Sequence, residues 1–407
     1  MPIRKLQSLL SRSFIYKLCI ALLVLLVFHL MTYYFLNISS ELHTNPNSHG
    51  VRYVRLGDKN STLNLKKKRP KILYWESFDN IDGAVECMKH CAYKCDVTKD
   101  VKEIETADAV LFHLMNIWSD NWSVGTKKTV AFPTYRRPDQ VWVMFNLEPP
   151  SNLFGDVHIF NGVFNWTIWY RKDATIYHPY GSFRALDENE AKMAELEFKD
   201  RNFFKEKTKN ISGMISNCKD SGQRYRLVDE LSRYIKIDMF GKCYNKQCGD
   251  YTKPQTCDYI TKSYKFYLGL ENSQCKDYVT EKYWSTLERE QIPIVNWDYN
   301  NIDESIPIPG SFVSINDFKS LKELAEYVEK VNNDETLYNS YFNWKKKYKI
   351  TYMCNACVAC EALHKPIQPQ VIEDFAGWVN NDVCDKVNKF NIWKVKLNEF
   401  LFWKLGI

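Results

Sequence analysis

The adjacent pair Glu281–Lys282 follows a strongly apolar run and is the first place where this chain could carry out chemistry. We expect a helix to begin near Tyr278 with Asp277 as its N-cap. Tyr278, Glu281 and Lys282 would then share one face of the helix near its N-terminus. The lysine could neutralise a phosphate oxygen, and the carboxylate could accept hydrogen bonds from vicinal sugar hydroxyls. This combination suits a nucleotide sugar, although the local chemistry alone slightly favours an ordinary solvated charge pair.

Two further positions place reactive groups next to predicted strand ends. Glu148 ends the apolar run QVWVMFNLE, and Pro149 and Pro150 prevent the strand from continuing. A partly desolvated carboxylate at this point can act as a general base, and an exposed strand-end acid explains it equally well. The segment SNCKDSGQRYR resembles a loop that opens into a helix at Arg224 and Arg226. An arginine there could bind a diphosphate, because its planar fork matches phosphate oxygens.

These residues would be brought together by parallel sheets, which collect ligands at the carboxyl ends of their strands. Strand and helix patterns alternate from KILYW onward, and a second alternation follows a highly charged stretch. We therefore predict an α/β fold of the GT-B type, with two Rossmann-like domains facing a cleft. The predicted parts are an N-terminal domain at 71–186, a charged linker or helix at 187–209, a C-terminal domain at 210–350, and a Cys-rich segment at 351–407 that packs back on the first domain.

The N-terminus predicts a membrane anchor. Residues 18–36 contain no Asp, Glu, Lys or Arg and are long enough to cross a bilayer. Residues 1–17 are basic, which favours a cytoplasmic tail and a type II orientation. A cleaved signal peptide is the alternative, but the apolar run ends in bulky residues and exceeds a typical signal core. Residues 37–70 are polar and predict a stem.

Sequons and cysteines favour the secretory side of the membrane. The sequons that we expect to be glycosylated begin at Asn60, Asn121, Asn165 and Asn210. One of the thirteen cysteines lies in the apolar N-terminal run, and the remaining twelve form an even number compatible with disulfides. Cys87, Cys91 and Cys95 recur every fourth residue, and Cys354, Cys357 and Cys360 every third. Zinc could bind either set, but an oxidising compartment favours disulfides whose pairing the sequence leaves open.

Composition excludes several other classes of function. The chain has 407 residues, 45% of them hydrophobic, and a formal net charge of +6. Its Lys and Arg residues are scattered, so we expect no nucleic-acid partner. Phosphate-loop, dinucleotide-binding, zinc-protease and serine-hydrolase motifs are absent from the sequence, as is the D-x-D motif of metal-dependent glycosyltransferases. These absences predict no metal site.

Taken together, the motifs resemble the α1,3-fucosyltransferase family. YKFYLGLENSQCKDYVTEKYW is similar to the family signature. The other segments also stand in the family's order: before the signature LEPPSN, FNWTIWYRKDATIYHPYG and SNCKDSGQRYR, and after it IPIVNW and SFVSINDFKSLKELAEYV. The resemblance covers about residues 71–360. The cysteine-rich insert FGKCYNKQC is similar to that of the invertebrate and plant branch, which fucosylates the N-glycan core.

The resemblance implies an inverting enzyme that uses GDP-β-L-fucose as its donor substrate. By position, Glu148 matches the general base that takes the proton of the acceptor hydroxyl. The positions that match the family's donor pocket are Arg224, Glu271, Asn272, Tyr278, Glu281 and Lys282, with Glu281 on the ribose and both cations on the diphosphate. LEPPSN, RKDAT and GLEN depart from the family's commoner ESP, R-x-DSD and FEN, and these departures bear on acceptor contacts more than on catalysis.

The prediction is therefore a Golgi fucosyltransferase that acts on the 3-hydroxyl of GlcNAc in the N-glycan core of a glycoprotein. Two alternatives stay open: the same chemistry on peripheral N-acetyllactosamine, and a catalytically silent member that binds glycans. No cofactor is expected to be obligatory, while a divalent cation could stimulate the reaction. A homodimer is compatible with the sequence.

Overall fold

The computed structural model describes residues 69–75, 81–117, 132–153, 156–218, 223–249, 255–366, 370–381 and 383–384. The predicted tail, membrane anchor and nearly all of the stem lie outside these ranges, as do Asn60 and Asn121. Among the helices of the described ranges, none combines the length and apolarity that a membrane crossing requires.

The first half of the described chain forms a six-stranded parallel sheet with the order β2-β1-β3-β4-β5-β6. Its central strands are short apolar runs such as VWVMF, in which every residue is buried. Such runs are typical of parallel strands covered on both faces. The strands are β1 (Lys71–Trp75), β2 (Asp96–Thr98), β3 (Ala109–His113), β4 (Val141–Phe145), β5 (Trp166–Trp169) and β6 (Ile176–Tyr177).

The second half forms a five-stranded parallel sheet with the order β12-β11-β10-β8-β9. The two parallel sheets confirm the predicted α/β fold. The strands are β8 (Lys209–Met214), β9 (Asp238–Phe240), β10 (Tyr264–Leu268), β11 (Ile292–Val295) and β12 (Val313–Ser314). The α-helices of this half are α5 (Arg224–Leu231), α6 (Gln255–Lys262), α7 (Glu281–Glu288), α8 (Leu321–Asn333) and α9 (Glu335–Ser340).

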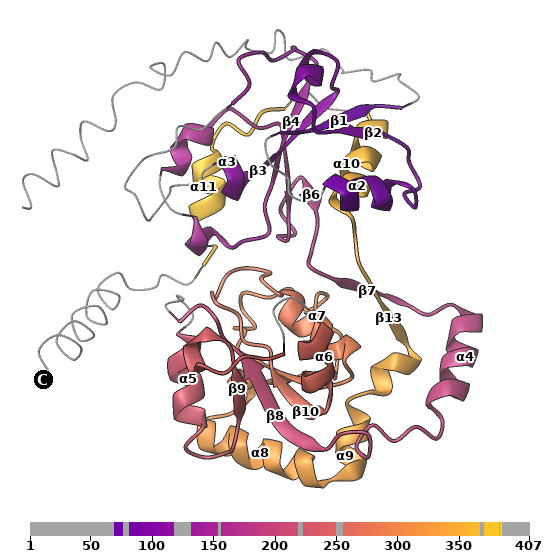
Figure 1. The fold of residues 1–407 in the computed structure, drawn as a ribbon, viewed down its shortest axis with the longest axis vertical. Helices are drawn as coiled ribbons and strands as arrows, with labels where there is room; N and C mark the ends of the chain where they lie inside the picture. The colour runs from indigo at the N-terminus through magenta and orange to yellow at the C-terminus, as the bar shows by residue number, and fades with distance from the viewer. Residues whose placement is uncertain are drawn as a thin grey trace, which may run out of the picture. The chain divides into compact units, whose positions relative to one another are not determined.

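A small antiparallel pair lies outside both sheets, in which β7 (Ser182–Ala185) runs against β13 (Tyr348–Thr351) (Figure 1). Between β7 and the second sheet, the charged stretch forms α4 (Glu188–Phe198). Asp187 and Glu190 cap its N-terminus reciprocally, each side chain accepting from the other's backbone N–H. This capping explains why so polar a segment is helical.

The C-terminal part of the described chain packs on the first sheet. Helix α10 (Asn355–His364) contributes buried residues to the same hydrophobic cluster as β1, β3 and β4, and α11 (Phe375–Asn380) contributes to the cluster on the other side of these strands. The two remaining helices on this sheet are α2 (Ile81–Met88) and α3 (Leu114–Ile117). The sheet of the first half, whose last strand ends at Tyr177, is therefore completed by helices that begin only at Asn355.

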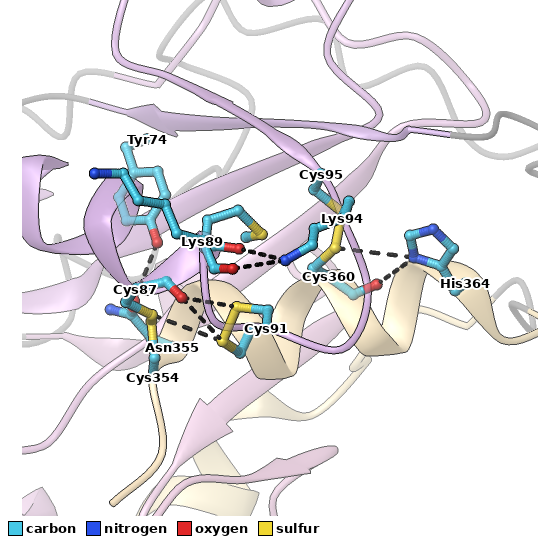
Figure 2. Close-up of a disulfide and its surroundings, with 12 residues drawn as sticks. Tyr74, Cys87, Lys89, Cys91, Lys94, Cys95, Cys354, Asn355, Cys360 and His364 are labelled. Carbon is cyan, nitrogen blue, oxygen red and sulfur yellow. Dashed lines mark hydrogen bonds between the residues drawn. A yellow bond between two sulfur atoms is a disulfide. The ribbon is translucent and has the colours of Figure 1, made fainter.

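Three disulfides join α2 and the loop after it to α10 and to its N-cap residue, Cys354 (Figure 2). Their pairing is Cys87–Cys354, Cys91–Cys357 and Cys95–Cys360. A further three pair Cys218–Cys243, Cys248–Cys257 and Cys275–Cys384. The predicted disulfides are therefore confirmed and their partners assigned. Bonded sulfurs offer no thiolates, so the zinc alternative for the two triplets does not apply to this state.

The position of Asn165 in the fold argues against the prediction that it carries a glycan. Its side chain is only 3% exposed and lies against β4 and the C-terminal segment. Its Oδ1 accepts from Arg136 Nη2 at 2.6 Å and from the backbone N–H of Trp142 at 2.8 Å. Its Nδ2, the atom to which a sugar would be attached, donates to the carbonyl of Gln370 at 2.9 Å. Asn165 therefore connects strands of the core. Asn210, at the start of β8, is exposed and stays a predicted acceptor.

Candidate functional site

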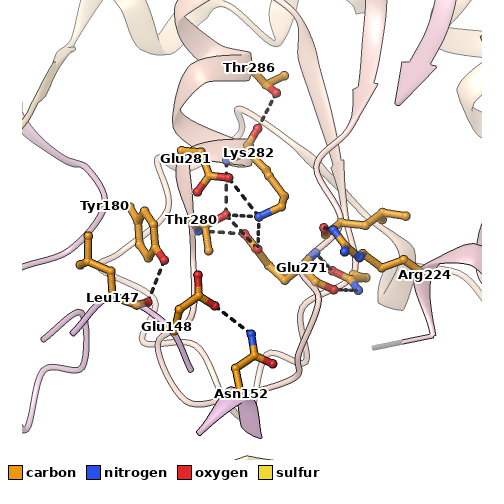
Figure 3. Close-up of polar contacts among 12 residues, drawn as sticks. Leu147, Glu148, Asn152, Tyr180, Arg224, Glu271, Thr280, Glu281, Lys282 and Thr286 are labelled. Carbon is orange, nitrogen blue, oxygen red and sulfur yellow. Dashed lines mark hydrogen bonds and ion pairs between the residues drawn. The ribbon is translucent and has the colours of Figure 1, made fainter. Parts of the chain in front are cut away.

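Glu148 lies in the turn after β4, as the sequence predicts. Hydrogen bonds hold both its backbone carbonyl and its carboxylate. The backbone carbonyl of Glu148 accepts from Asn146 Nδ2 at 2.8 Å and from Trp169 Nε1 at 3.1 Å. Its carboxylate Oε2 accepts from Asn152 Nδ2 at 2.8 Å (Figure 3). The side chain is half-buried. An ionised carboxylate with one fixed oxygen can still accept a proton on the other.

The charge of the Glu148 carboxylate acts on three tyrosines. Tyr180 donates from its hydroxyl to the carbonyl of Leu147 at 2.7 Å, and the rings of Tyr170 and Tyr278 are 4.9 Å apart. Burial raises the pKa of all three hydroxyls, and the negative charge of Glu148 adds to the increase. Glu271 and Glu281 also raise the pKa of Tyr180. The three hydroxyls are therefore neutral at physiological pH. The charges of Glu148, Glu271 and Glu281 all act on Tyr180.

Glu271 follows the end of β10 and is fully buried. Its carboxylate accepts from the backbone N–H of Thr280 at 2.8 Å and from Thr280 Oγ1 at 2.9 Å. Its backbone exchanges hydrogen bonds with the side chain of Asn296, at 2.8 Å and 3.2 Å. Burial raises the pKa of Glu271, while the charge of Lys282 and the bonds from Thr280 lower it. Glu271 thus connects the ends of two strands to the start of α7.

Lys282 lies in the first turn of α7, and its ammonium is already surrounded by oxygen atoms. The Nζ atom is 2.9 Å from Thr280 Oγ1, 3.3 Å from Glu271 Oε2 and 3.1 Å from Glu281 Oε1 (Figure 3). Burial lowers the pKa of Lys282, but the two carboxylates outweigh it, so the pKa lies above its ordinary value. Lys282 is therefore a charged ammonium paired with two acids.

The prediction that the helix begins near Tyr278 is wrong by three residues. Helix α7 begins at Glu281, and its N-cap is Thr280, whose hydroxyl accepts from the N–H of Lys282. Asp277 is not a cap, because its backbone has a φ of +60° and its carboxylate accepts from the N–H groups of Lys172 and Asp303. Tyr278 therefore does not share a helix face with Glu281 and Lys282. It lies buried in the hydrophobic cluster of the first sheet.

Arg224 is the first residue of α5 and is buried, as the sequence pattern placed it at a helix start. Its Nη1 donates to the carbonyl of Leu270 at 3.3 Å, directly before Glu271. The charge of Arg224 also lowers the pKa of Lys282, so the two cations act on each other. Asn272 follows Glu271 and is half-buried. The predicted donor residues, apart from Tyr278, thus collect where β10, α5 and α7 meet.

One hydrogen bond connects this group to the turn that carries Glu148. Ser151 Oγ donates to Ser273 Oγ at 2.7 Å and lies 3.8 Å from Cys275 Sγ. Ser151 is three residues after Glu148, and Ser273 is two residues after Glu271. The base candidate of the first sheet and the cations of the second are therefore brought into one region.

Sequence reasoning missed four residues that hold the site together: Asn152, Tyr180, Thr280 and Asn296. Thr280 offered a usable signal, since a threonine directly before Glu281 and Lys282 is a good N-cap. Asn152 also stood close to Glu148 in the chain. Tyr180 and Asn296 gave no such signal, because their contacts join positions 33 and 25 residues apart.

Comparison with known proteins identifies the family. Residues 67–181 match the model of the N-terminal part of fucosyltransferases, and residues 204–378 match that of the C-terminal part of glycosyltransferase family 10 (fucosyltransferase). These two stretches include every predicted catalytic and donor-binding residue.

Individual relatives agree with the family models. The chain is 30% identical over 341 residues to the α-(1,3)-fucosyltransferase fut-5 of Caenorhabditis elegans, covering 78% of this chain and 85% of that protein. It is 33% identical over 293 residues to glycoprotein 3-α-L-fucosyltransferase A of Drosophila melanogaster, covering 70% of this chain and 54% of that protein.

A human relative, the 3-galactosyl-N-acetylglucosaminide 4-α-L-fucosyltransferase FUT3, is 31% identical over 290 residues, covering 70% of this chain and 74% of that protein. A solved α1,3-fucosyltransferase with GDP-fucose is 15% identical, with a TM-score of 0.42 over 79% of this chain and 94% of that chain. The matches of sequence, over both halves of the described structure, show that the chain belongs to glycosyltransferase family 10, the fucosyltransferases.

Proposed function

We propose that this fucosyltransferase transfers L-fucose from GDP-β-L-fucose to the 3-hydroxyl of a GlcNAc residue in a glycoprotein glycan, with inversion at the anomeric carbon. The observation that carries the proposal is the grouping of one carboxylate, Glu148, with two cations, Arg224 and Lys282, through the contact of Ser151 with Ser273. Inverting transfer by direct displacement needs a base on one side of the sugar and stabilisation of a leaving phosphate on the other.

The donor side would be formed by α5, α7 and the end of β10. Arg224 and Lys282 would stabilise the negative charge that develops on the diphosphate as GDP leaves. The first turn of α7 adds the positive end of its dipole. Glu281, whose side chain is 59% exposed, would accept hydrogen bonds from the ribose hydroxyls. Asn272 and Glu271 would form the wall of the pocket, with Glu271 holding Thr280 and Lys282 in place.

Glu148 would remove the proton of the acceptor hydroxyl as the bond to the anomeric carbon forms. Its half-buried position and its fixed Oε2 suit a base whose free oxygen faces a neutral sugar. Tyr278 is proposed to act through packing, because its ring contacts Tyr170 and its hydroxyl lies among the tyrosines around Glu148.

We propose the N-glycan core as the acceptor. The cysteine-rich insert between β9 and α6, closed by Cys248–Cys257, supports this choice, as does the similarity to a glycoprotein fucosyltransferase of Drosophila melanogaster. The nearly equal identity to a human enzyme named for a galactosyl-N-acetylglucosaminide makes a peripheral N-acetyllactosamine acceptor the second candidate.

The same proposal includes a GT-B arrangement of the two sheets around a cleft, and a Golgi location with residues 18–36 as a type II anchor. It needs no obligatory metal, and a divalent cation would at most stimulate transfer. A homodimer is compatible with it. The six disulfides support an oxidising compartment such as the secretory pathway.

The test is transfer of fucose by the purified full-length protein to a panel of core and antennary glycans, with and without EDTA. We expect transfer to core GlcNAc, loss of about 100-fold or more in kcat for Glu148→Gln, and no loss with EDTA. Asn355→Ala, which removes a hydrogen bond from Tyr74 near the disulfides, serves as the control and should keep full activity. Binding of GDP without transfer to any glycan would instead indicate a silent glycan-binding protein.

A further inference from the structure

We propose that Asn152 is a positioning residue for catalysis: its amide fixes one oxygen of the Glu148 carboxylate so that the other faces the acceptor hydroxyl. This inference rests on the proposed role of Glu148 as the base. Asn152 Nδ2 donates to Glu148 Oε2 at 2.8 Å, and Figure 3 shows the amide pointing at that carboxylate. A donor on one carboxylate oxygen favours the ionised form and restricts rotation of the carboxylate.

The backbone between the two residues is built to bring them together. Pro149 and Pro150 open a short 3-10 turn over Pro150–Asn152, and Pro150 stands at its first position. Proline fixes its own φ near the value that such a turn needs. The N–H of Asn152 donates to the carbonyl of Pro149 at 2.9 Å, which closes the turn. The side chain of Asn152 is thereby returned to the carboxylate four residues before it.

The same turn is attached to the donor side. Ser151 stands next to Asn152 and donates to Ser273, two residues after Glu271. At the other end, Trp169 and Asn146 both donate to the backbone carbonyl of Glu148. The backbone of Glu148 is thus held by residues of the first sheet, and its carboxylate oxygen is held by a turn that contacts the second half of the chain. This arrangement is what a base needs if it must meet a sugar presented from another part of the fold.

Other ionisable groups lie near Glu148. Tyr170, Tyr180 and Tyr278 lie within its electrostatic reach, and all three are neutral because their pKa values are raised. The charges of Glu271 and Glu281 also raise the pKa of Tyr180. Asn152 donates directly to the carboxylate, so removing its side chain should change how the base is held without altering these neighbours.

The experiment compares Asn152→Ala and Asn152→Asp with the wild type in steady-state transfer from GDP-fucose. The aspartate side chain has the shape of asparagine, but it lacks the N–H donor and its charge repels Glu148. We therefore expect kcat to fall about 10-fold for alanine and about 100-fold for aspartate. The KM for GDP-fucose should stay unchanged in both, because the cations that would bind the diphosphate are untouched.

A purely structural role gives a different pattern. If Asn152 only fills space, aspartate behaves like wild type, and alanine lowers the melting temperature with an unchanged kcat. That pattern overturns the inference. Asn355→Ala again controls for loss of a partly buried hydrogen bond elsewhere, here between β1 and α10. Glu148→Gln separates the two proposals. If this variant keeps its activity, Glu148 is not the base and the proposed mechanism is ruled out. If it is inactive while Asn152→Ala is fully active, only the proposed role of Asn152 is ruled out.

Discussion

Replacing Lys282 by methionine should destabilise the folded protein through Glu271 rather than through Lys282 itself. Glu271 is completely buried and Lys282 is the cation next to it, with the side chain of the lysine 21% exposed. The methionine keeps much of the volume of the lysine and removes its charge. Glu271 would then keep its two hydrogen bonds from Thr280 but lose its ion pair. Removing one partner of a buried pair costs about 3–5 kcal/mol, and the bonds from Thr280 should reduce this to about 2–4 kcal/mol.

The effect should depend on pH in a defined direction. Burial already raises the pKa of Glu271 above 4.5, and loss of Lys282 should raise it further. Below about pH 4.5 the carboxyl is protonated in the folded and the unfolded chain, so the penalty is absent. As the pH rises through the folded pKa, the buried carboxylate must ionise and the penalty is fully expressed. The variant should therefore fall further below the wild type at pH 8 than at pH 5.

Thermal melting of the purified full-length protein without donor measures this, at roughly 2–4 °C for each kcal/mol. Lys322→Met is the matched control, because Lys322 and its partner Glu326 are both exposed and the pair is worth about 0.5 kcal/mol or less. Adding Glu271→Gln to Lys282→Met should recover stability at pH 8. The reasoning is refuted if Lys282→Met melts like Lys322→Met at pH 8, or if its deficit grows as the pH falls.

Three further outcomes are expected. Replacing both Cys87 and Cys354 by serine should cost only about 2–3 kcal/mol, because the two neighbouring disulfides keep the long loop closed; unfolding on this change alone, judged by circular dichroism, would contradict the redundancy. Peptide mass spectrometry of protein from a secretory host should find a glycan at Asn210 and none at Asn165, and Asn165→Ala should cost about 2–4 kcal/mol because two N–H donors lose their acceptor. Glu281→Gln should strengthen binding of inorganic pyrophosphate in calorimetry, since a competing anion is removed from Lys282, and weaker binding would argue against that competition.

The strands of this fold could be read from the sequence because burial on both faces leaves an apolar run with few interruptions. KILYW, VWVMF and YKFYL are apolar runs of this kind, and all three are strands of parallel sheets. The start of α7 could not be read as reliably. Asp277 is as good an N-cap as Thr280 by residue type. The backbone of Asp277 adopts a positive φ because its carboxylate is engaged by residues far away in the sequence, at Lys172 and Asp303.

Contacts between residues far apart in the sequence also limited what could be predicted about the disulfides and about Asn165. The two cysteine triplets have spacings of four and three, which are both compatible with one face of a helix. The sequence therefore predicts that they form disulfides, but no local rule pairs Cys87 with Cys354. Asn165 shows the reverse case. Its sequon is a correct local pattern, yet the side chain is held inside the core by Arg136 and by the carbonyl of Gln370.

The opposite charges of Glu281 and Lys282 have a further consequence for the proposed donor site. Glu271 is buried and held by Thr280, so it stays with Lys282 whether or not a ligand is present. Glu281 is 59% exposed, and an exposed ion pair is exchanged at little cost. A diphosphate that reaches Lys282 should therefore replace Glu281 and leave Glu271 in place. Glu281 would then be free to accept from ribose hydroxyls at the moment when the diphosphate takes its position, which gives each member of the pair its own target on one donor molecule.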